Sequence, residues 1–126
     1  GHIYFQLKVE ANDPYLMEFT PRFDACHMWN LIKYATGLDL RKVTLENLAY
    51  GRSHTLSNFK GETKAVETHF ISDFPGTIVN KENYNIPDNP LYIEWYYEDK
   101  EKVKSVTGYI EKIGYYIKGL YERYLF

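Results

Sequence analysis

The feature that most constrains the fold is an apolar repeat near the C-terminus. Its members recur at alternating spacings of three and four residues and are Val103, Val106, Ile110, Ile113, Ile117, Leu120 and Tyr124. Such spacing places all of these side chains in one narrow seam along an α-helix. We therefore predict a single long C-terminal helix, whose seam must be covered by the rest of the chain or by another chain.

The residues beside this seam favour packing within the chain over a coiled coil. Written as heptads from Val103, the flanking positions hold Tyr109 and Tyr116, where a two-stranded coiled coil would carry opposite charges. Tyrosines widen the apolar stripe toward the width that a helix needs to pack on a sheet. Three glycines in the repeat each cost about 1 kcal/mol in a helix interior, so the helix needs tertiary support. We expect it to cover a sheet, with a homodimer through this helix as the alternative.

The rest of the chain predicts that sheet. Residues 3–10 and 15–20 flank the turn signal Asn12-Asp13-Pro14 and are expected to form a hairpin. On its first strand, one face carries Ile3, Phe5, Leu7 and Val9. Further strands are expected at residues 38–43, 52–59, 63–72, 77–79 and 91–98, and further helices at residues 21–35 and 44–50. The predicted fold is α+β, with a mostly antiparallel sheet of about five to six strands, a helix in the N-terminal half and the long C-terminal helix packed on the sheet.

Length and composition exclude several classes of protein. The 126 residues match one domain, and 44% hydrophobic with 25% charged residues is typical of a globular chain. The formal net charge of -2 gives no general attraction to nucleic acid. No uninterrupted apolar run approaches the roughly 20 residues of a membrane span. We therefore expect a globular protein that does not bind membranes.

The single cysteine and the first two residues bear on the setting of the chain. Cys26 alone cannot form an internal disulfide, which favours an intracellular location, in the cytoplasm or nucleus. We interpret Cys26 as a buried structural residue. Gly1 and His2 precede a strand-like run without an initiator Met, as the remnant of an affinity tag would. Residues 3–126 are then expected to form a single α+β domain, which a longer natural protein could contain.

The chain is rich in tyrosine, with 13 among its 126 residues. In the predicted helix Tyr115 lies opposite the seam and Tyr116 lies on its flank, while Tyr92 and Tyr96 lie on the outer face of the preceding strand. Tyrosine is enriched at protein interfaces because it offers rigid contact area and a hydroxyl group. These four residues predict a partner-binding surface, and a non-catalytic protein-interaction or regulatory domain is the leading hypothesis. The alternative is that the helix at residues 21–35 covers the outer sheet face.

A second hypothesis is a small-ligand domain or a simple enzyme. Its pocket would lie between the sheet and the C-terminal helix, lined by Trp29, His54, His69 and Trp95. His54, His69 and Glu67 could also meet on two strands as ligands of zinc or iron. Their spacing matches no metal-binding motif, so we expect surface histidines and assign no metal and no other cofactor. The sequence contains no recognisable catalytic pattern, which favours a binding protein over an enzyme.

A third hypothesis is the stacking of single-stranded nucleic acid on exposed aromatic rings. Such binding also needs a basic groove that follows the phosphate backbone. The lysines at positions 100, 102 and 104 alternate with acidic residues, which indicates a solvated surface instead. A protein partner is therefore favoured over nucleic acid.

Overall fold

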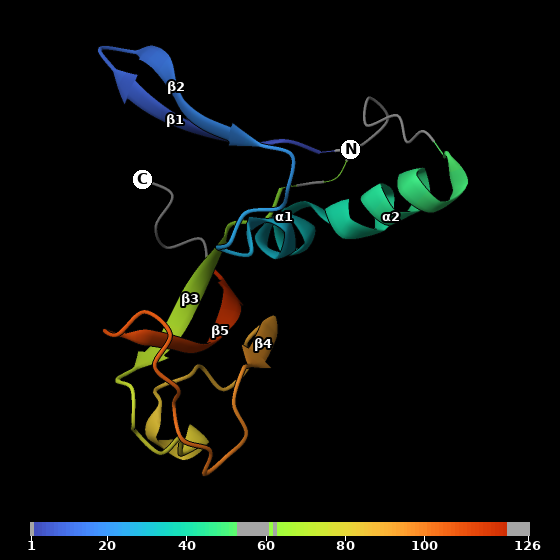
Figure 1. Ribbon diagram of the computed structural model, residues 1–126. Coiled ribbons are helices and arrows are strands. Elements are labelled where there is room, and N and C mark those ends of the chain that lie inside the picture. Colours follow the sequence, from blue (N-terminus) through green and yellow to red (C-terminus); the bar gives the residue numbers. More distant parts are fainter. Residues whose placement is uncertain (1, 53–60, 62, 121–126) are drawn as a thin grey trace. The chain divides into compact units, whose positions relative to one another are not determined.

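The computed structural model describes residues 2–52, 61 and 63–120 of the chain. The chain divides into two compact units, Gly1–Thr63 and Lys64–Phe126, and each is described separately here. The first contains strands β1 (Tyr4–Glu10) and β2 (Asp13–Thr20) and helices α1 (Met28–Thr36) and α2 (Leu40–Tyr50) (Figure 1). The second contains strands β3 (Val66–Asp73), β4 (Tyr92–Trp95) and β5 (Glu111–Gly119) and the short 3-10 helix η2 (Lys81–Asn83).

The predicted N-terminal hairpin is confirmed. Strands β1 and β2 pair in antiparallel fashion, and the turn between them consists of Ala11 and Asn12. Both turn residues have positive φ angles, 50° and 70°. This backbone matches the twist of the flanking strands in a two-residue hairpin. The register shifts between Gln6 and Leu7, which leaves Met17 as an extra residue on β2.

The two helices of the first unit differ in extent from the predictions. Helix α1 begins at Met28 and not near residue 21, because the Asp24 carboxylate accepts hydrogen bonds from the backbone of both Cys26 and Met28 at its start. The expected strand at residues 38–43 is wrong, since Asp39 caps α2 by accepting from the Lys42 backbone N–H at 3.0 Å. The predicted C-terminal ends of the two helices, at residues 35 and 50, agree with the structure to within one residue, and Gly37 and Gly51 follow the helices in the left-handed conformation.

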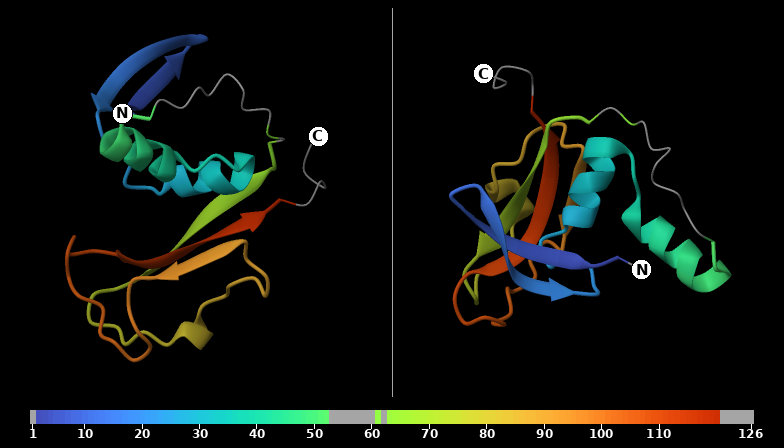
Figure 2. Two further views of the ribbon diagram at one scale, coloured as in Figure 1. Left: turned by 90° about the vertical axis from the view of Figure 1, so that its right-hand side faces the viewer. Right: turned by 90° about the horizontal axis from the view of Figure 1, so that it is seen from above.

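The prediction of a long C-terminal helix is wrong. Residues Glu111–Gly119 form β5, the central strand of a three-stranded antiparallel sheet in the order β3-β5-β4 (Figure 2). The run from Ile113 to Ile117 consists of β-branched and aromatic residues around one glycine, which favours a strand over a helix. The alternative of a homodimer through this helix is therefore also wrong, because the helix does not form. Residues 121–126, the last part of the predicted helix, lie outside the described residues.

The single predicted sheet of five to six strands is also wrong, because the five described strands form two separate small sheets. The expected strand at residues 77–79 is reduced to one bridge between Ile78 and Lys102. Most of the strand expected at residues 52–59 lies outside the described residues. The strand expected at residues 91–98 is shortened to β4. The prediction of one domain over residues 3–126 stays a prediction.

Buried side chains lie on both faces of the three-stranded sheet, with Ile71 and Tyr116 on one face and Tyr115 and Ile117 on the other. A cluster of buried side chains joins the sheet to the loops after β3 and β4; its members are Ile71, Val79, Val103, Ile113 and Tyr116. Partly buried aromatic residues, among them Tyr84, Trp95 and Tyr97, pack around this cluster. Neither α1 nor α2, the α-helices of the described residues, is long and apolar enough to cross a lipid bilayer.

Candidate functional site

Three of the four predicted partner-binding tyrosines lie together around β5. The ring of Tyr115 lies 5.5 Å from that of Tyr92 and 6.3 Å from that of Tyr96, with Phe70 at 6.2 Å on the other side. Tyr115 is fully buried, whereas Tyr96 is 39% exposed. The expected position of Tyr115 on the open side of a helix is therefore wrong, because it occupies the central strand of a sheet.

Hydrogen bonds and burial restrain the tyrosines of this cluster. The hydroxyl of Tyr92 donates to Oε2 of Glu94 at 3.0 Å. Burial raises the pKa of Tyr96 to about 12, and the negative charge of Glu94 adds to the shift. The hydroxyl group of Tyr96 therefore stays protonated at neutral pH, where it can donate a hydrogen bond but cannot act as a base.

Tyr116 faces the opposite side of the sheet and stacks on His69. Their rings are nearly parallel, with an angle of 3° and centroids 4.9 Å apart. Nε2 of His69 lies 2.8 Å from Oε1 of Glu67, and Nζ of Lys118 lies 2.7 Å from the same oxygen. The hydrogen bond from Lys118 is the largest cause that lowers the pKa of Glu67, and the hydrogen bond from His69 is the next largest. The carboxylate is thus already neutralised by a cation, which disfavours the metal site that was considered for it.

The other predicted pocket residues are not assembled by a C-terminal helix, because that helix does not form. Trp29 is the second residue of α1, and the Arg41 guanidinium lies 4.5 Å from its ring centroid. Trp95 ends β4 and packs beside Tyr84. His54 lies outside the described residues. Among the described residues, no group of three or more His, Cys, Asp or Glu side chains could hold a metal ion.

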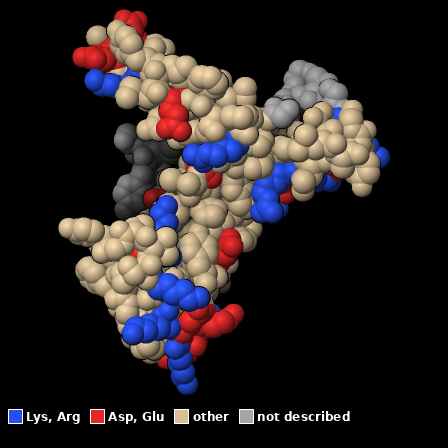
Figure 3. All heavy atoms as spheres, viewed as in Figure 1, with Lys and Arg blue, Asp and Glu red and all other residues tan. Residues whose placement is uncertain are grey.

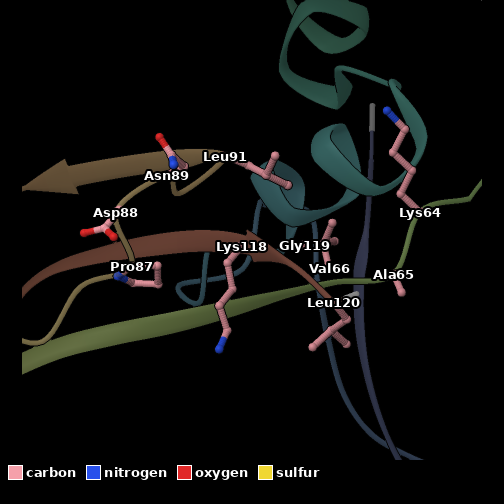
Figure 4. A pocket seen from close by; sticks show the side chains of 10 residues that line it. All are labelled: Lys64, Ala65, Val66, Pro87, Asp88, Asn89, Leu91, Lys118, Gly119 and Leu120. Carbon is pink, nitrogen blue, oxygen red and sulfur yellow. The ribbon is translucent and has the colours of Figure 1, made fainter. Parts of the chain in front are cut away.

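A pocket that the sequence did not predict lies at one end of the three-stranded sheet. It encloses about 590 Å³ where β3 begins, β5 ends and the loop of residues 87–91 passes (Figure 4). Its apolar lining includes Val66, Leu91 and Leu120, while Lys64 and Asp88 add charges. Pro, Asp and Asn, the residue types at positions 87–89, are typical of loops, but the approach of this loop to both strands depends on the pairing of β3 with β5.

One face of the hairpin is an exposed apolar surface. Its register pairs Phe5 with Phe19 and Leu7 with Leu16, so these side chains share one face. We call this surface the apolar hairpin face; it consists of Ile3, Phe5, Leu7, Val9, Leu16 and Phe19. Each of the six residues is more than half exposed, from 53% to 66%. The alternation of apolar and polar residues in the sequence predicted that Ile3, Phe5, Leu7 and Val9 share one face.

The opposite face of the hairpin is polar. The register places Gln6 opposite Glu18 and Glu10 opposite Asp13. Nζ of Lys8 lies 3.4 Å from Oε2 of Glu10 on the same face. Acidic side chains gather at the tip of the hairpin (Figure 3). The hairpin is therefore amphipathic: its polar face is suited to contact with water, and its apolar face is suited to contact with another apolar surface.

Cys26 does not fill the structural role expected of it. Its side chain is free and exposed, and not buried. It precedes α1, where Asp24 accepts a hydrogen bond from its backbone N–H at 2.7 Å. A thiol in this position is open to chemical labelling, so thiol cross-linking of the hairpin requires its replacement.

Among the described residues, the apolar hairpin face and the pocket beside β3 are two surfaces that are suited to binding a partner or a ligand. No family model, no curated protein and no solved structure matches the chain.

Proposed function

We propose that this chain is a non-catalytic protein-interaction domain and that the apolar hairpin face is its binding surface. The observation that carries the proposal is the exposure of six large apolar side chains on one face of a two-stranded sheet. Exposed apolar patches of several hundred Å² are rare on monomeric proteins and mark interaction sites.

The energetics of a hairpin support a partner for this face. A two-stranded hairpin is marginally stable in water unless its apolar face is packed against another element. The six exposed residues present on the order of 100 Å² each, or about 600 Å² in total, given the size of such side chains. At about 25 cal/mol per Å², covering them would contribute roughly 15 kcal/mol before the costs of association.

The tyrosine cluster has a secondary place in this proposal. Tyr96 is partly exposed and its hydroxyl stays protonated, so it can contribute a contact at the edge of an interface. Tyr115 is fully buried, so it cannot contact a partner directly, but its ring packs against those of Tyr92 and Tyr96. An intracellular location and the absence of nucleic-acid partners are part of the same proposal, on the grounds of the unpaired Cys26 and the net charge of -2.

The proposal can be tested with two variants that introduce the same charge on opposite faces of β1. Leu7→Glu places a carboxylate on the apolar hairpin face, and Gln6→Glu places one on the polar face. Proteins recovered from a lysate would be purified and titrated against the wild type and both variants. We expect Leu7→Glu to weaken binding at least about 10-fold and Gln6→Glu to change it little. Equal binding by all three proteins would place the interaction elsewhere and refute the proposal.

A second candidate function, the binding of a small ligand, is favoured by the pocket beside β3. Its volume of about 590 Å³ is within the range of small-molecule sites, and its lining is largely apolar with a few polar groups. A thermal-shift screen would test it, with Ala65→Trp as a variant that fills the pocket. A compound that stabilises the wild type and not the variant would support this function. If no compound in a broad screen separates the two proteins, the pocket has no ligand of the classes screened and this candidate is dropped.

A further inference from the structure

We infer that the occupant of the apolar hairpin face is a second copy of this chain, packed face to face about a two-fold axis with the two hairpins antiparallel. The inference rests on the proposed function, because it names the partner of the same surface. In this arrangement each hairpin supplies the layer that the other lacks, and two marginal sheets become a small β-sandwich.

The distribution of side-chain size along the hairpin favours the antiparallel arrangement. The base carries two large rings, because Phe5 pairs with Phe19 and their centroids lie 6.4 Å apart. The tip carries smaller side chains, because Val9 pairs with Pro14. Packed sheets keep a nearly constant spacing of about 10 Å, so large side chains on one sheet fit best against small ones on the other. Antiparallel hairpins place the rings of each base over the tip of the other copy.

The negative charge at the tip of the hairpin also favours the antiparallel arrangement. The tip of the hairpin is acidic, with Glu10 opposite Asp13 next to the turn. Both residues lie on the polar face, so they point away from the interface, and the antiparallel arrangement places the two acidic tips at opposite ends of the dimer. A parallel arrangement would instead bring the two acidic tips together, which costs electrostatic energy.

The face itself selects an apolar partner. It carries no charged or hydrogen-bonding side chain among its six members, so a polar surface placed against it would lose its contacts with water without replacement. A second apolar hairpin face has no such groups to desolvate. A two-fold interface also needs only one surface patch, which meets itself.

The area sets the expected strength of the dimer. With about 600 Å² from each copy, the interface would bury about 1,200 Å², which is at the lower end for specific complexes. We therefore expect a reversible dimer with a dissociation constant in the micromolar range. Such a dimer would be populated at high protein concentration and would separate on dilution.

Sedimentation velocity over a concentration series tests the inference on the full chain. The wild type and Gln6→Glu should convert from monomer to dimer as the concentration rises from low micromolar to several hundred micromolar. Leu7→Glu should remain monomeric, with a dissociation constant raised at least about 100-fold, because each interface would bury two unpaired carboxylates. Circular dichroism of each variant would verify that the strand content is retained.

Cross-linking provides a test that keeps the face uncharged. Leu7 is the middle residue of β1, so in the antiparallel dimer it approaches the same residue of the second copy. In a Cys26→Ser background, Leu7→Cys should be joined into a covalent dimer by a bismaleimide that spans about 10 Å, the distance between packed sheets. Gln6→Cys in the same background should yield at most a small fraction of that product.

The other occupants give distinct results. A wild type that stays monomeric, while binding a hydrophobic dye that Leu7→Glu no longer binds, would overturn the second copy as the occupant and leave the proposed interaction surface standing. A monomer that binds no dye would overturn both, because the face would then be covered by the same chain. A dimer that survives Leu7→Glu and gives no Leu7→Cys cross-link would place self-association on another surface and overturn the inference.

Discussion

The hydroxyl of Tyr84 donates a hydrogen bond of 2.6 Å to Oδ2 of Asp73 and so joins the residue after η2 to the last residue of β3. Burial and this carboxylate raise the pKa of Tyr84 to about 12. In turn, the hydroxyl lowers the pKa of Asp73 below its ordinary value. The pair therefore fixes the loop that contributes Tyr84 and Val79 to the core.

Removing this hydrogen bond should destabilise the second unit. Tyr84→Phe keeps the ring and deletes the donor, and we expect unfolding to become easier by about 1 kcal/mol. Tyr109→Phe is the matched control, because Tyr109 is 82% exposed in the same unit. Urea unfolding followed by tryptophan fluorescence measures both. Equal stability of the two variants would show that the Asp73 bond contributes nothing in water.

The same pair predicts a loss of stability at both extremes of pH. The pKa of Asp73 is lower in the folded chain, so its contribution is present above the ordinary value of 3.8 and lost as the pH falls below it. The pKa of Tyr84 is higher in the folded chain, so its contribution is present below 10 and lost as the pH rises toward 12. Thermal unfolding across pH should show both losses reduced in Tyr84→Phe. Identical pH profiles for the variant and the wild type would contradict this linkage.

Gly114 is the position in β5 where a side chain should be least tolerated. A Cβ atom there would lie 2.5 Å from the carbonyl oxygen of Glu94 and 3.3 Å from Cα of Trp95, both on the paired strand. Backbone atoms cannot move aside as a flexible side chain can, so we expect Gly114→Ala to cost about 1 to 3 kcal/mol. Gly119→Ala is the control within the same strand, because no atom lies within 4 Å of its added Cβ. Urea unfolding would refute the argument if the two variants were equally stable.

The sequence predicted the hairpin well because its signals are local. Two runs of branched and aromatic residues flank a short polar turn, and alternation alone assigned Phe5 and Leu7 to one face. What it could not predict was exposure. Whether an apolar face is covered depends on elements far away in the chain or on another chain, and no pattern within residues 3–20 carries that information.

The C-terminal repeat led to a wrong helix prediction because a spacing of four residues fits both a helix and a strand. Residues four apart share a face of a helix, and they also share a face of a strand, where the period is two. A spacing of three should distinguish a helix from a strand, because it fits only the helix. The spacing from Ile110 to Ile113 does not do so, because Ile110 precedes β5 and Ile113 is an extra residue on β5, opposite the register shift between Ile71 and Ser72. Such a bulge reverses the alternation of the strand. The apparent seam is thus broken into a strand and an exposed loop, in which Val106 is 80% exposed.

The carboxylate of Glu111 organises that loop. Its Oε1 atom accepts hydrogen bonds from the backbone N–H groups of Val106, Thr107 and Gly108, at 2.7, 2.6 and 3.2 Å. These bonds lower the pKa of Glu111, and the bond from the Val106 N–H has the largest effect. A single buried side chain therefore replaces the backbone partners that the loop lacks.

Glu111→Gln should loosen the loop and weaken its pH dependence. The amide has one acceptor oxygen and no charge, so it cannot hold three donors as strongly, and the melting temperature should fall. Because the folded pKa of Glu111 is depressed, its contribution is present above the ordinary value of 4.5 and is lost as the pH falls below it. Glu98→Gln, at a side chain 93% exposed, is the control. Faster amide exchange in residues 106–108 of Glu111→Gln alone would confirm the role, and unchanged exchange would contradict it.

Asp39 has two partners at the start of α2, and two substitutions can separate their contributions. Its carboxylate accepts from the Lys42 backbone N–H at 3.0 Å and lies 2.9 Å from Nζ of Lys33. Asp39→Ala removes the cap and the ion pair, and we expect a loss of about 1 kcal/mol with a lower helical signal in circular dichroism. Asp39→Asn keeps a capping oxygen and loses only the exposed ion pair, which contributes little. Asp39→Asn should therefore stay close to the wild type in thermal stability. If it instead falls to the level of Asp39→Ala, then the bond to Lys33, and not the cap, stabilises the start of α2.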